Sequence, residues 1–250
     1  MATSFMDKDG ARLAPPADLL EAERRCAAAS LPDPVLAAVR RLQEAGYTAL
    51  LVGGAVRDCL LGRTVGDWDV ATSATPAQVM EVFERTIPTG VEHGTVTVLI
   101  GRGDDRVAVE VTTFRGDVAY EDGRRPAAVR FLTDVREDLA RRDFTINAFA
   151  WDPVARRLFD EFEGLSDLQA GRVRAVGAPR ARFEEDGLRP MRGVRFCATL
   201  GFSLDPATEE AISQTLSVFD RVARERVRVS TRVPRVRAGP GSARRRDARE

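Results

Sequence analysis

The sequence contains few of the residues that build covalent cross-links or metal sites. Its 250 residues include one histidine and three cysteines. Cys26, Cys59 and Cys197 are odd in number and far apart, and none belongs to a CxxC pair. This pattern argues against a disulfide framework and against a zinc site, and it predicts three free thiols.

Long apolar runs are also missing. No stretch approaches the roughly 18 uncharged apolar residues that indicate a membrane span. The opening segment MATSFMDKDGARLAPP has no apolar core and does not resemble a secretory signal. With 44% hydrophobic and 30% charged residues, the composition is that of an ordinary folded protein. We therefore expect a cytoplasmic location and no membrane partner.

The chain has no net charge, because 38 basic and 38 acidic residues cancel. The charge is unevenly distributed, however, since residues 221–250 carry eleven arginines against three acidic residues. A basic end can meet RNA phosphates, although a merely solvated tail explains it equally well. The length allows one large domain or two small ones with a cleft between them. Nothing in the sequence indicates an oligomeric state.

Helical and strand patterns alternate in the first half of the chain. Residues 1–33 have no sustained period and predict a weakly ordered extension, within which 19–29 could form a short helix. Proline and threonine start signals and glycine stop signals then delimit the elements. We expect helices at 34–46, 55–62 and 75–85, and strands at 47–54, 67–73, 95–101 and 106–114, the last two as a hairpin.

The second half of the chain is mainly helical in pattern. From Asp134 onward a short hairpin within 149–162 is the exception, and helices are expected at 188–202 and 208–228. Arg189, Arg192 and Arg195 recur at a spacing of three, which places them along one helical face. After residue 229 there is no apolar period, and we expect a disordered basic tail.

Two aspartates in the sequence GDWDVAT are the clearest chemical signal. Residues two apart on a strand project to the same side, so Asp67 and Asp69 can aim both carboxylates at one point. Hard oxygen ligands beside a phosphate-bearing substrate favour Mg²⁺. Upstream, Gly53 and Gly54 follow a strand and let backbone N–H groups approach phosphate, while Arg57 adds a charged donor. Each piece alone also fits an ordinary solvated turn.

Taken together, GGAVRD followed by GDWDVAT resembles the head-domain signature of the bacterial tRNA nucleotidyltransferase (CCA-adding enzyme) and poly(A) polymerase family, class II type. The blocks TGVEHGTVTV, VEVTTFR, EDLARRDFTINAFA and EDGLRPMRGVRF follow in the family's order, so the resemblance covers roughly residues 35–228. It implies an α+β fold with a polymerase-β-like mixed-sheet head at 34–152 and a helical neck at 153–228. The remainder, 229–250, would be a tail that lacks the family's body and tail domains.

The resemblance also implies roles for individual residues. Glu110 corresponds to a third carboxylate beside the metal pair, the alternative being an exposed edge-strand glutamate. Arg142 is assigned to the triphosphate, and Asp143 and Asn147 to the sugar and the pocket wall. His93 has a family counterpart that we interpret as structural.

A last motif concerns base selection. In the family, residues corresponding to Glu185, Asp186 and Arg189, followed by Arg192 and Arg195, pair with the edge of the incoming base. A plain surface salt bridge is the alternative for this segment. The chain departs from the family pattern at Gly187 and Pro190, and we expect Pro190 to bend the helix.

The resemblance implies transfer of CMP and AMP from CTP and ATP to the 3′ end of tRNA, with Mg²⁺ and release of pyrophosphate. The length of the loop at 116–129 argues against an enzyme that adds only C residues. Poly(A) polymerase activity and a catalytically incompetent nucleotide- or RNA-binding remnant are the alternatives.

Overall fold

We describe the fold from a computed structural model. It covers residues 15–101, 103, 106–116 and 130–219, together with two short paired strands, β1 (Phe5–Met6) and β2 (Arg12–Leu13). The expected tail at 229–250 and nearly all of the expected loop at 116–129 lie outside the described residues. Within the part of the chain that is described, no helix is long and apolar enough to span a bilayer.

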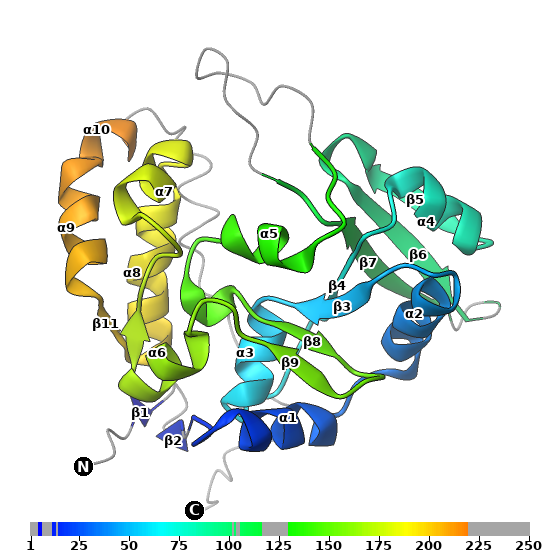
Figure 1. The fold of residues 1–250 in the computed structure, drawn as a ribbon, viewed down its shortest axis with the longest axis horizontal. Helices are drawn as coiled ribbons and strands as arrows, with labels where there is room; N and C mark the ends of the chain where they lie inside the picture. Colours follow the sequence, from blue (N-terminus) through cyan, green and yellow to red (C-terminus); the bar gives the residue numbers. More distant parts are fainter. Residues whose placement is uncertain are drawn as a thin grey trace, which may run out of the picture.

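A mixed sheet of seven strands forms the centre of the fold (Figure 1). The strand order is β5-β6-β7-β4-β3-β8-β9, and only β4 and β7 are parallel neighbours. The strands are β3 (Ala49–Val52), β4 (Asp69–Thr72), β5 (Thr86–Gly90), β6 (Thr95–Ile100), β7 (Val107–Thr113), β8 (Ala150–Asp152) and β9 (Arg157–Phe159). The predicted α+β class and the hairpin of β6 with β7 are confirmed.

Strand β3 is buried along its whole length because both faces of the sheet are covered there. Alternate residues enter different cores, as the two-residue period of a strand requires. Leu51 joins the core that α2 (Asp33–Glu44) and α4 (Pro76–Val82) cover, and Leu50 joins a smaller core that includes Leu139 of α5 (Val135–Ala140). A buried central strand is a rigid support for the glycine turn that follows it.

The N-terminal extension, which we expected to be weakly ordered apart from a possible short helix at 19–29, contains a packed helix. Residues Leu19–Ala28 form α1, which contacts α3 (Gly54–Leu60) and β9. Ala22 and Cys26, four residues apart on one helical face, are buried. The Asp18 carboxylate accepts the Glu21 N–H at 2.7 Å and caps the helix. A narrow apolar stripe and one cap are therefore enough to fix this helix against the sheet domain.

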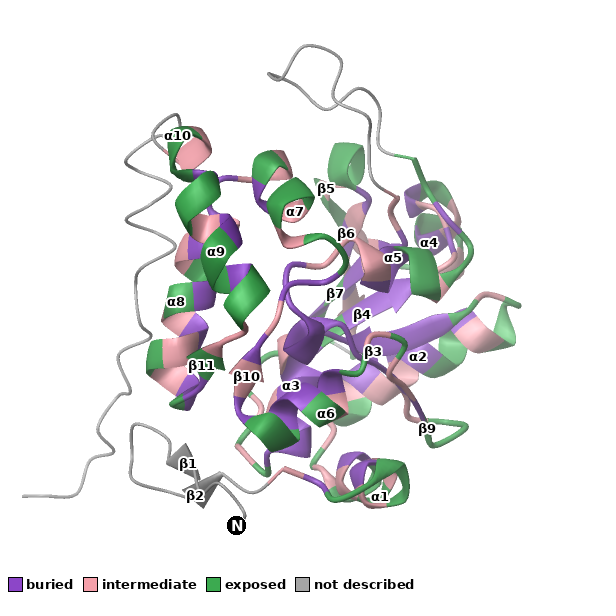
Figure 2. Ribbon diagram, turned by 60° about the vertical axis from the view of Figure 1, so that its left-hand side comes forward, coloured by how far each residue is buried: buried purple, intermediate pink, exposed green. Residues whose placement is uncertain are grey.

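The C-terminal helices stand beside the sheet rather than on it (Figures 1 and 2). They are α6 (Gly164–Ala170), α7 (Pro179–Glu185), α8 (Arg189–Leu200), α9 (Pro206–Gln214) and α10 (Leu216–Phe219), with a small parallel sheet of β10 (Arg172–Val173) and β11 (Ser203–Leu204). Helix α8 packs closely on the head, since a Cβ on Gly193 would lie 2.8 Å from Phe144 Cζ. Gly193 thus allows the close approach that brings the α8 arginines to the head.

The boundary between head and neck lies later than the expected residue 152. Strands β8 and β9 pair as an antiparallel hairpin, so the sheet continues to Phe159. The buried Asp167 carboxylate then accepts bonds from Thr145 Oγ1, Arg172 Nε and Arg174 Nε at 2.6, 2.7 and 2.8 Å. This polar cluster links η3 (Thr145–Asn147) of the head to the first segment after the sheet.

Candidate active site

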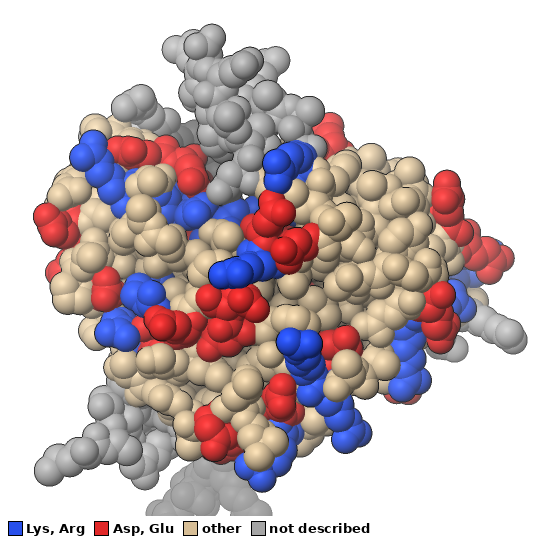
Figure 3. All heavy atoms as spheres, in the orientation of Figure 1, with Lys and Arg blue, Asp and Glu red and all other residues tan. Residues whose placement is uncertain are grey.

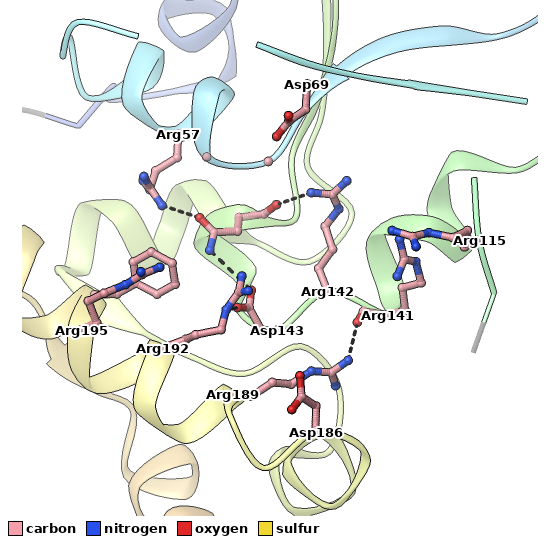
Figure 4. A pocket seen from close by; sticks show the side chains of 14 residues that line it. Arg57, Asp69, Arg115, Arg141, Arg142, Asp143, Asp186, Arg189, Arg192 and Arg195 are labelled. Carbon is pink, nitrogen blue, oxygen red and sulfur yellow. Dashed lines mark hydrogen bonds and ion pairs between the residues drawn. The ribbon is translucent and has the colours of Figure 1, made fainter. Parts of the chain in front are cut away.

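A cavity of about 490 Å³ lies between the head and the C-terminal helices (Figure 4). Its lining comes from the turn between β3 and α3, the first residue of β4, the segment after β7, the α5–η3 segment, the turn after α7, and α8. The lining residues are Gly53, Gly54, Arg57, Asp69, Arg115, Arg141, Arg142, Asp143, Asn147, Asp186, Arg189, Arg192, Arg195 and Phe196. Every residue that we predicted to bind nucleotide is among them except Glu185. Asp69 also lines the cavity, whereas Asp67 and Glu110 do not.

The glycine turn before α3 has a steric cause. Gly53 adopts φ +77°, a left-handed conformation that side chains rarely tolerate. A Cβ at this position would also lie only 2.8 Å from Arg142 Nη1. The turn therefore needs glycine at residue 53 both for its backbone and for the approach of the Arg142 guanidinium.

A chain of hydrogen bonds along one wall of the cavity connects α3 to α8. Arg57 Nη1 donates to Asn147 Oδ1 at 2.5 Å, and Asn147 Nδ2 donates to Asp143 Oδ1 at 3.4 Å. Arg192 Nε then donates to Asp143 Oδ2 at 2.6 Å. Asp143 and Asn147 are buried, so the first two bonds are formed away from water, and the third ties this wall of the cavity to the partly exposed Arg192.

A buried carboxylate, Asp138, organises the arginines of the head wall. Its Oδ2 accepts from Arg142 Nη2, and its Oδ1 accepts from Arg141 Nε and from the Arg115 backbone N–H, all at 3.1 Å. Burial would raise the pKa of Asp138, but the charges of Arg142 and Arg141 outweigh it and hold the pKa below its usual range. Asp138 is therefore the ionised counter-charge for this group of arginines.

The three predicted carboxylates gather at the edge of the cavity without forming a closed cluster. Asp69 is the first residue of β4, and Asp67 precedes the strand. Because Val70 is in register with Val111, Glu110 lies beside Asp69 on the neighbouring strand. Burial first, and then the charges of Glu110 and Asp67, raise the pKa of Asp69, while Arg142 opposes the rise. Within the described residues, no group of three or more acidic, histidine or cysteine side chains is arranged to hold a metal ion.

Asp186 and Arg189, the residues expected to read the base, do not share a helix. Asp186 ends α7 and lies in the turn, where its Oδ1 accepts the Leu188 N–H at 3.0 Å. Arg189 begins α8, and its Nη1 pairs with Glu185 Oε2 at 2.6 Å rather than with Asp186. Arg189 Nη2 also donates to the Arg141 carbonyl at 3.2 Å, which places the guanidinium at the cavity.

Two further expectations concern α8. Pro190 lies in the first turn of α8, where its missing N–H removes no helical hydrogen bond, so the expected bend at Pro190 is wrong. The spacing of Arg189, Arg192 and Arg195 does place all three on the face that lines the cavity.

Three cavity residues were absent from the predicted site. Arg115 belongs to the block VEVTTFR, and its Nη1 donates to the His93 carbonyl at 2.8 Å, which gives His93 a backbone role. Arg141 precedes Arg142, and both pair with the buried Asp138 carboxylate. The sequence does not show that Asp138 is buried, so it could not predict that both arginines line the cavity. The guanidinium carbons of Arg57 and Arg195 lie over the Phe196 ring, 5.2 and 5.5 Å from its centroid.

The charge of the cavity is strongly positive. Seven arginines line it against three aspartates, Asp69, Asp143 and Asp186. On the face seen in Figure 3, by contrast, basic and acidic side chains of the described residues are interspersed. The concentration of arginine is therefore a property of the cavity and suits a polyanionic ligand.

A mixed sheet with a glycine turn, strand-borne carboxylates and an arginine-lined cavity defines the nucleotidyltransferase class of fold and site. The family model described as the poly A polymerase head domain matches residues 49–174. The chain belongs to this family.

Curated relatives and solved structures agree with the family. The CCA-adding enzyme of Lactobacillus johnsonii is 48% identical over 202 residues, which are 80% of this chain and 50% of that protein. The CCA-adding enzyme of Streptococcus suis is 48% identical over 75% of this chain and 45% of that protein. The crystal structure of the Bacillus stearothermophilus CCA-adding enzyme in complex with CTP superposes with a TM-score of 0.71 at 42% identity, covering 80% of this chain and 48% of that one. This chain thus spans about half the length of these relatives.

Proposed function

We propose that this chain carries the nucleotide-transfer site of a template-independent RNA nucleotidyltransferase, which adds CMP and AMP from CTP and ATP to the 3′ end of tRNA. The observation that carries the proposal is the cavity of seven arginines with Asp69 at its edge. In this reading residues 34–159 form the catalytic head, and the following helices to residue 219 form a neck that contacts the base.

The arginines suit a triphosphate better than a singly charged ligand. Two of the seven arginines of the cavity, Arg141 and Arg142, share the single carboxylate of Asp138, so the paired carboxylates do not match the arginines one for one. The Nε atoms of Arg142 and Arg115 are buried and have no hydrogen-bond partner among the described residues. Buried donors of this kind favour an anion that completes their bonding. Arg57, Arg142 and the Gly53–Gly54 turn would hold the phosphates.

The carboxylates fit a divalent metal ion that bridges protein and substrate. Asp67 and Asp69 offer hard oxygen donors, and burial together with the charges of Glu110 and Asp67 raises the pKa of Asp69. Mg²⁺ commonly binds through one or two carboxylates together with phosphate oxygens and water, so it needs no closed protein cage. Asp67 and Asp69 would hold Mg²⁺, with Glu110 beside them. When bound, the metal ion would activate the attacking hydroxyl and stabilise the leaving pyrophosphate.

The reaction would form one P–O bond and break another. The 3′ hydroxyl of the acceptor attacks the α-phosphorus, and the bond to the bridging oxygen of the β-phosphate breaks in line. Arg142 and Arg57 stabilise the charge that develops on the phosphates. Asp186 and Arg189 would meet the edge of the base, because both line the far end of the same cavity from Asp69 (Figure 4).

A transfer assay tests the proposal directly. Purified chain is incubated with Mg²⁺, each labelled triphosphate in turn, and a tRNA that lacks its last three nucleotides. We expect incorporation of CMP, followed by AMP when both triphosphates are present. Repeated incorporation of AMP alone would indicate poly(A) polymerase activity. Binding of CTP without any incorporation would overturn the proposal and indicate a nucleotide-binding remnant.

A further inference from the structure

A second cavity, of about 540 Å³, adjoins the arginine-lined one. Both cavities are lined by Gly54, Arg57, Asp69, Arg195 and Phe196, which therefore form the wall between them. The second cavity, which we call the loop cavity, is otherwise lined by Ala55, Asp58, the loop at 63–67 and, on α8, Thr199 and Leu200. Thr64 and Gly66 are exposed, so the loop forms its rim.

The loop cavity differs from its neighbour in charge. It has three arginines and three aspartates, whereas the first cavity has seven and three. Two of these arginines share the single carboxylate of Asp58, whose Oδ1 lies 3.0 Å from Arg57 Nη2 and 3.8 Å from Arg63 Nη1, so the charge of Arg63 is only partly offset. Val65, Phe196 and Leu200 add apolar surface. This lining suits a nucleoside with a single phosphodiester better than a triphosphate.

The position of the loop cavity matches the geometry of in-line transfer. The attacking oxygen and the leaving group must lie on opposite sides of the phosphorus. Asp69 lies in the shared wall, and Asp67 lines only the loop cavity. A hydroxyl that arrives from the loop cavity would reach both carboxylates from the side away from the arginines that suit pyrophosphate.

We propose that the loop cavity receives the 3′-terminal nucleoside of the acceptor RNA. The inference rests on the proposed nucleotide transfer and assigns the second substrate to its own site. Arg63 meets the last phosphodiester at the rim, the hydroxyl groups of Thr64 and Thr199 contact the sugar, and Phe196 with Leu200 packs against the base. The terminal 3′ hydroxyl then points to Asp67 and Asp69.

Photo-crosslinking tests this placement without depending on turnover. A short RNA that ends in 4-thiouridine is irradiated with the full chain in Mg²⁺, and the linked peptide is located by mass spectrometry. We expect links within residues 63–67 or 195–200. Links confined to residues 186–192, or none above the level of an RNA labelled at its 5′ end, would overturn the proposal even if transfer is observed.

Steady-state kinetics separate the acceptor from the nucleotide. Arg63→Ala removes the rim charge, and Thr199→Trp fills the loop cavity from an α8 position that is only partly buried. Each should raise the KM for acceptor RNA about tenfold, the effect of losing one good contact, while the KM for CTP stays within a factor of about two. Arg180→Ala is the matched control, because Arg180 is exposed, pairs with Glu184 and lines neither cavity.

The outcomes distinguish this inference from the proposed function. If the wild-type chain transfers nucleotide and both variants match Arg180→Ala, the loop cavity is not the acceptor site. A higher KM for CTP in both variants would assign the cavity to the incoming nucleotide instead. If the wild-type chain transfers nothing, the proposed function fails, and the crosslink position alone decides where an RNA end binds.

Discussion

The two walls of the arginine-lined cavity hold their arginines in different ways. On the head wall Arg142 pairs with Asp138, whose side chain is 2% exposed, and on the helical wall Arg189 pairs with Glu185, whose side chain is 29% exposed. The Asp138 carboxylate cannot turn to water and is held rigidly, whereas the partly exposed Glu185 carboxylate exchanges partners at lower cost. The difference matches the chemistry proposed for each wall, because CTP and ATP share their triphosphate and differ in their base.

The largest expected effect is loss of transfer when the carboxylates beside both walls are removed. Asp69→Ala or Asp67→Ala should lower kcat by a factor of about 100 or more, as expected when charge stabilisation of a transition state is lost. Neither side chain belongs to the apolar cores of the head, so circular dichroism should show an unchanged fold. A variant that keeps more than about a tenth of the wild-type rate would contradict the metal assignment.

Asp138→Asn should weaken the head wall next. Removal of one partner from a buried ion pair costs about 3 kcal/mol or more, and here Arg141 and Arg142 both lose their counter-charge. We expect the KM values for CTP and ATP to rise alike, because Arg142 would be less well held and both nucleotides carry the triphosphate that it is proposed to bind. Arg142→Ala should show the same equal rise. Unequal losses for the two nucleotides would show that the head wall also reads the base.

Asp167→Asn is the matched control for Asp138→Asn. Asp167 is equally buried and also holds two arginines, but Arg172 and Arg174 line neither cavity, whereas the two arginines of Asp138 line the arginine-lined one. It should lose comparable stability while keeping the nucleotide KM values of the wild type. If Asp167→Asn raises KM as much as Asp138→Asn does, general destabilisation explains both.

The lowered pKa of Asp138 predicts a pH dependence of stability. Its carboxyl is more acidic when folded than when unfolded, so its contribution is fully present above the unfolded value of about 3.9 and is lost as pH falls through the lower folded value. Urea unfolding of the wild type and of Asp138→Asn should therefore differ most at neutral pH and converge below about pH 4. A difference that persists unchanged at acid pH would contradict the linkage.

A smaller effect is expected at the glycine turn. Gly53→Ala places a methyl group 2.8 Å from Arg142 Nη1 and should displace that guanidinium, raising the KM for both nucleotides about tenfold. Gly46→Ala is the control, since Gly46 has a similar φ of +88° and no atom within 4 Å of the added carbon. Both variants should lose similar stability, about 1 kcal/mol. Equal KM values in the two variants would show that Arg142 tolerates the displacement.

The sequence predicted from local spacing the glycine turn and six of the seven strands of the sheet, all except β5, and its resemblance to the family supplied most of the cavity residues. It missed what depends on contacts between distant segments. Arg115 reaches the cavity only because its backbone is bound to Asp138, 23 residues later. The sequence allowed a short helix at 19–29, but it did not show that burial of Ala22 and Cys26 fixes α1 against α3 and β9, which lie far away in the sequence. The placement of Asp186 in a turn, rather than on the helix of Arg189, likewise depends on how α7 ends.

The smallest effect on rate, and the sharpest test of the comparison, is expected at the helical wall. Arg189→Ala removes a guanidinium that Glu185 and the carbonyls of Arg182 and Arg141 hold at the cavity, and Asp186→Ala removes a carboxylate from the same end. Since neither residue is proposed to contact the phosphates, kcat/KM for the preferred nucleotide should fall only modestly. The ratio of kcat/KM for CTP to that for ATP should change about tenfold, because one or two base hydrogen bonds are worth roughly that much discrimination. Arg192→Ala provides the contrast, since Arg192 supports Asp143 and should weaken both nucleotides equally. A constant ratio in all three variants would mean that the pairing of Arg189 with Glu185 is structural. The head wall and the helical wall would then not bind the triphosphate and the base separately.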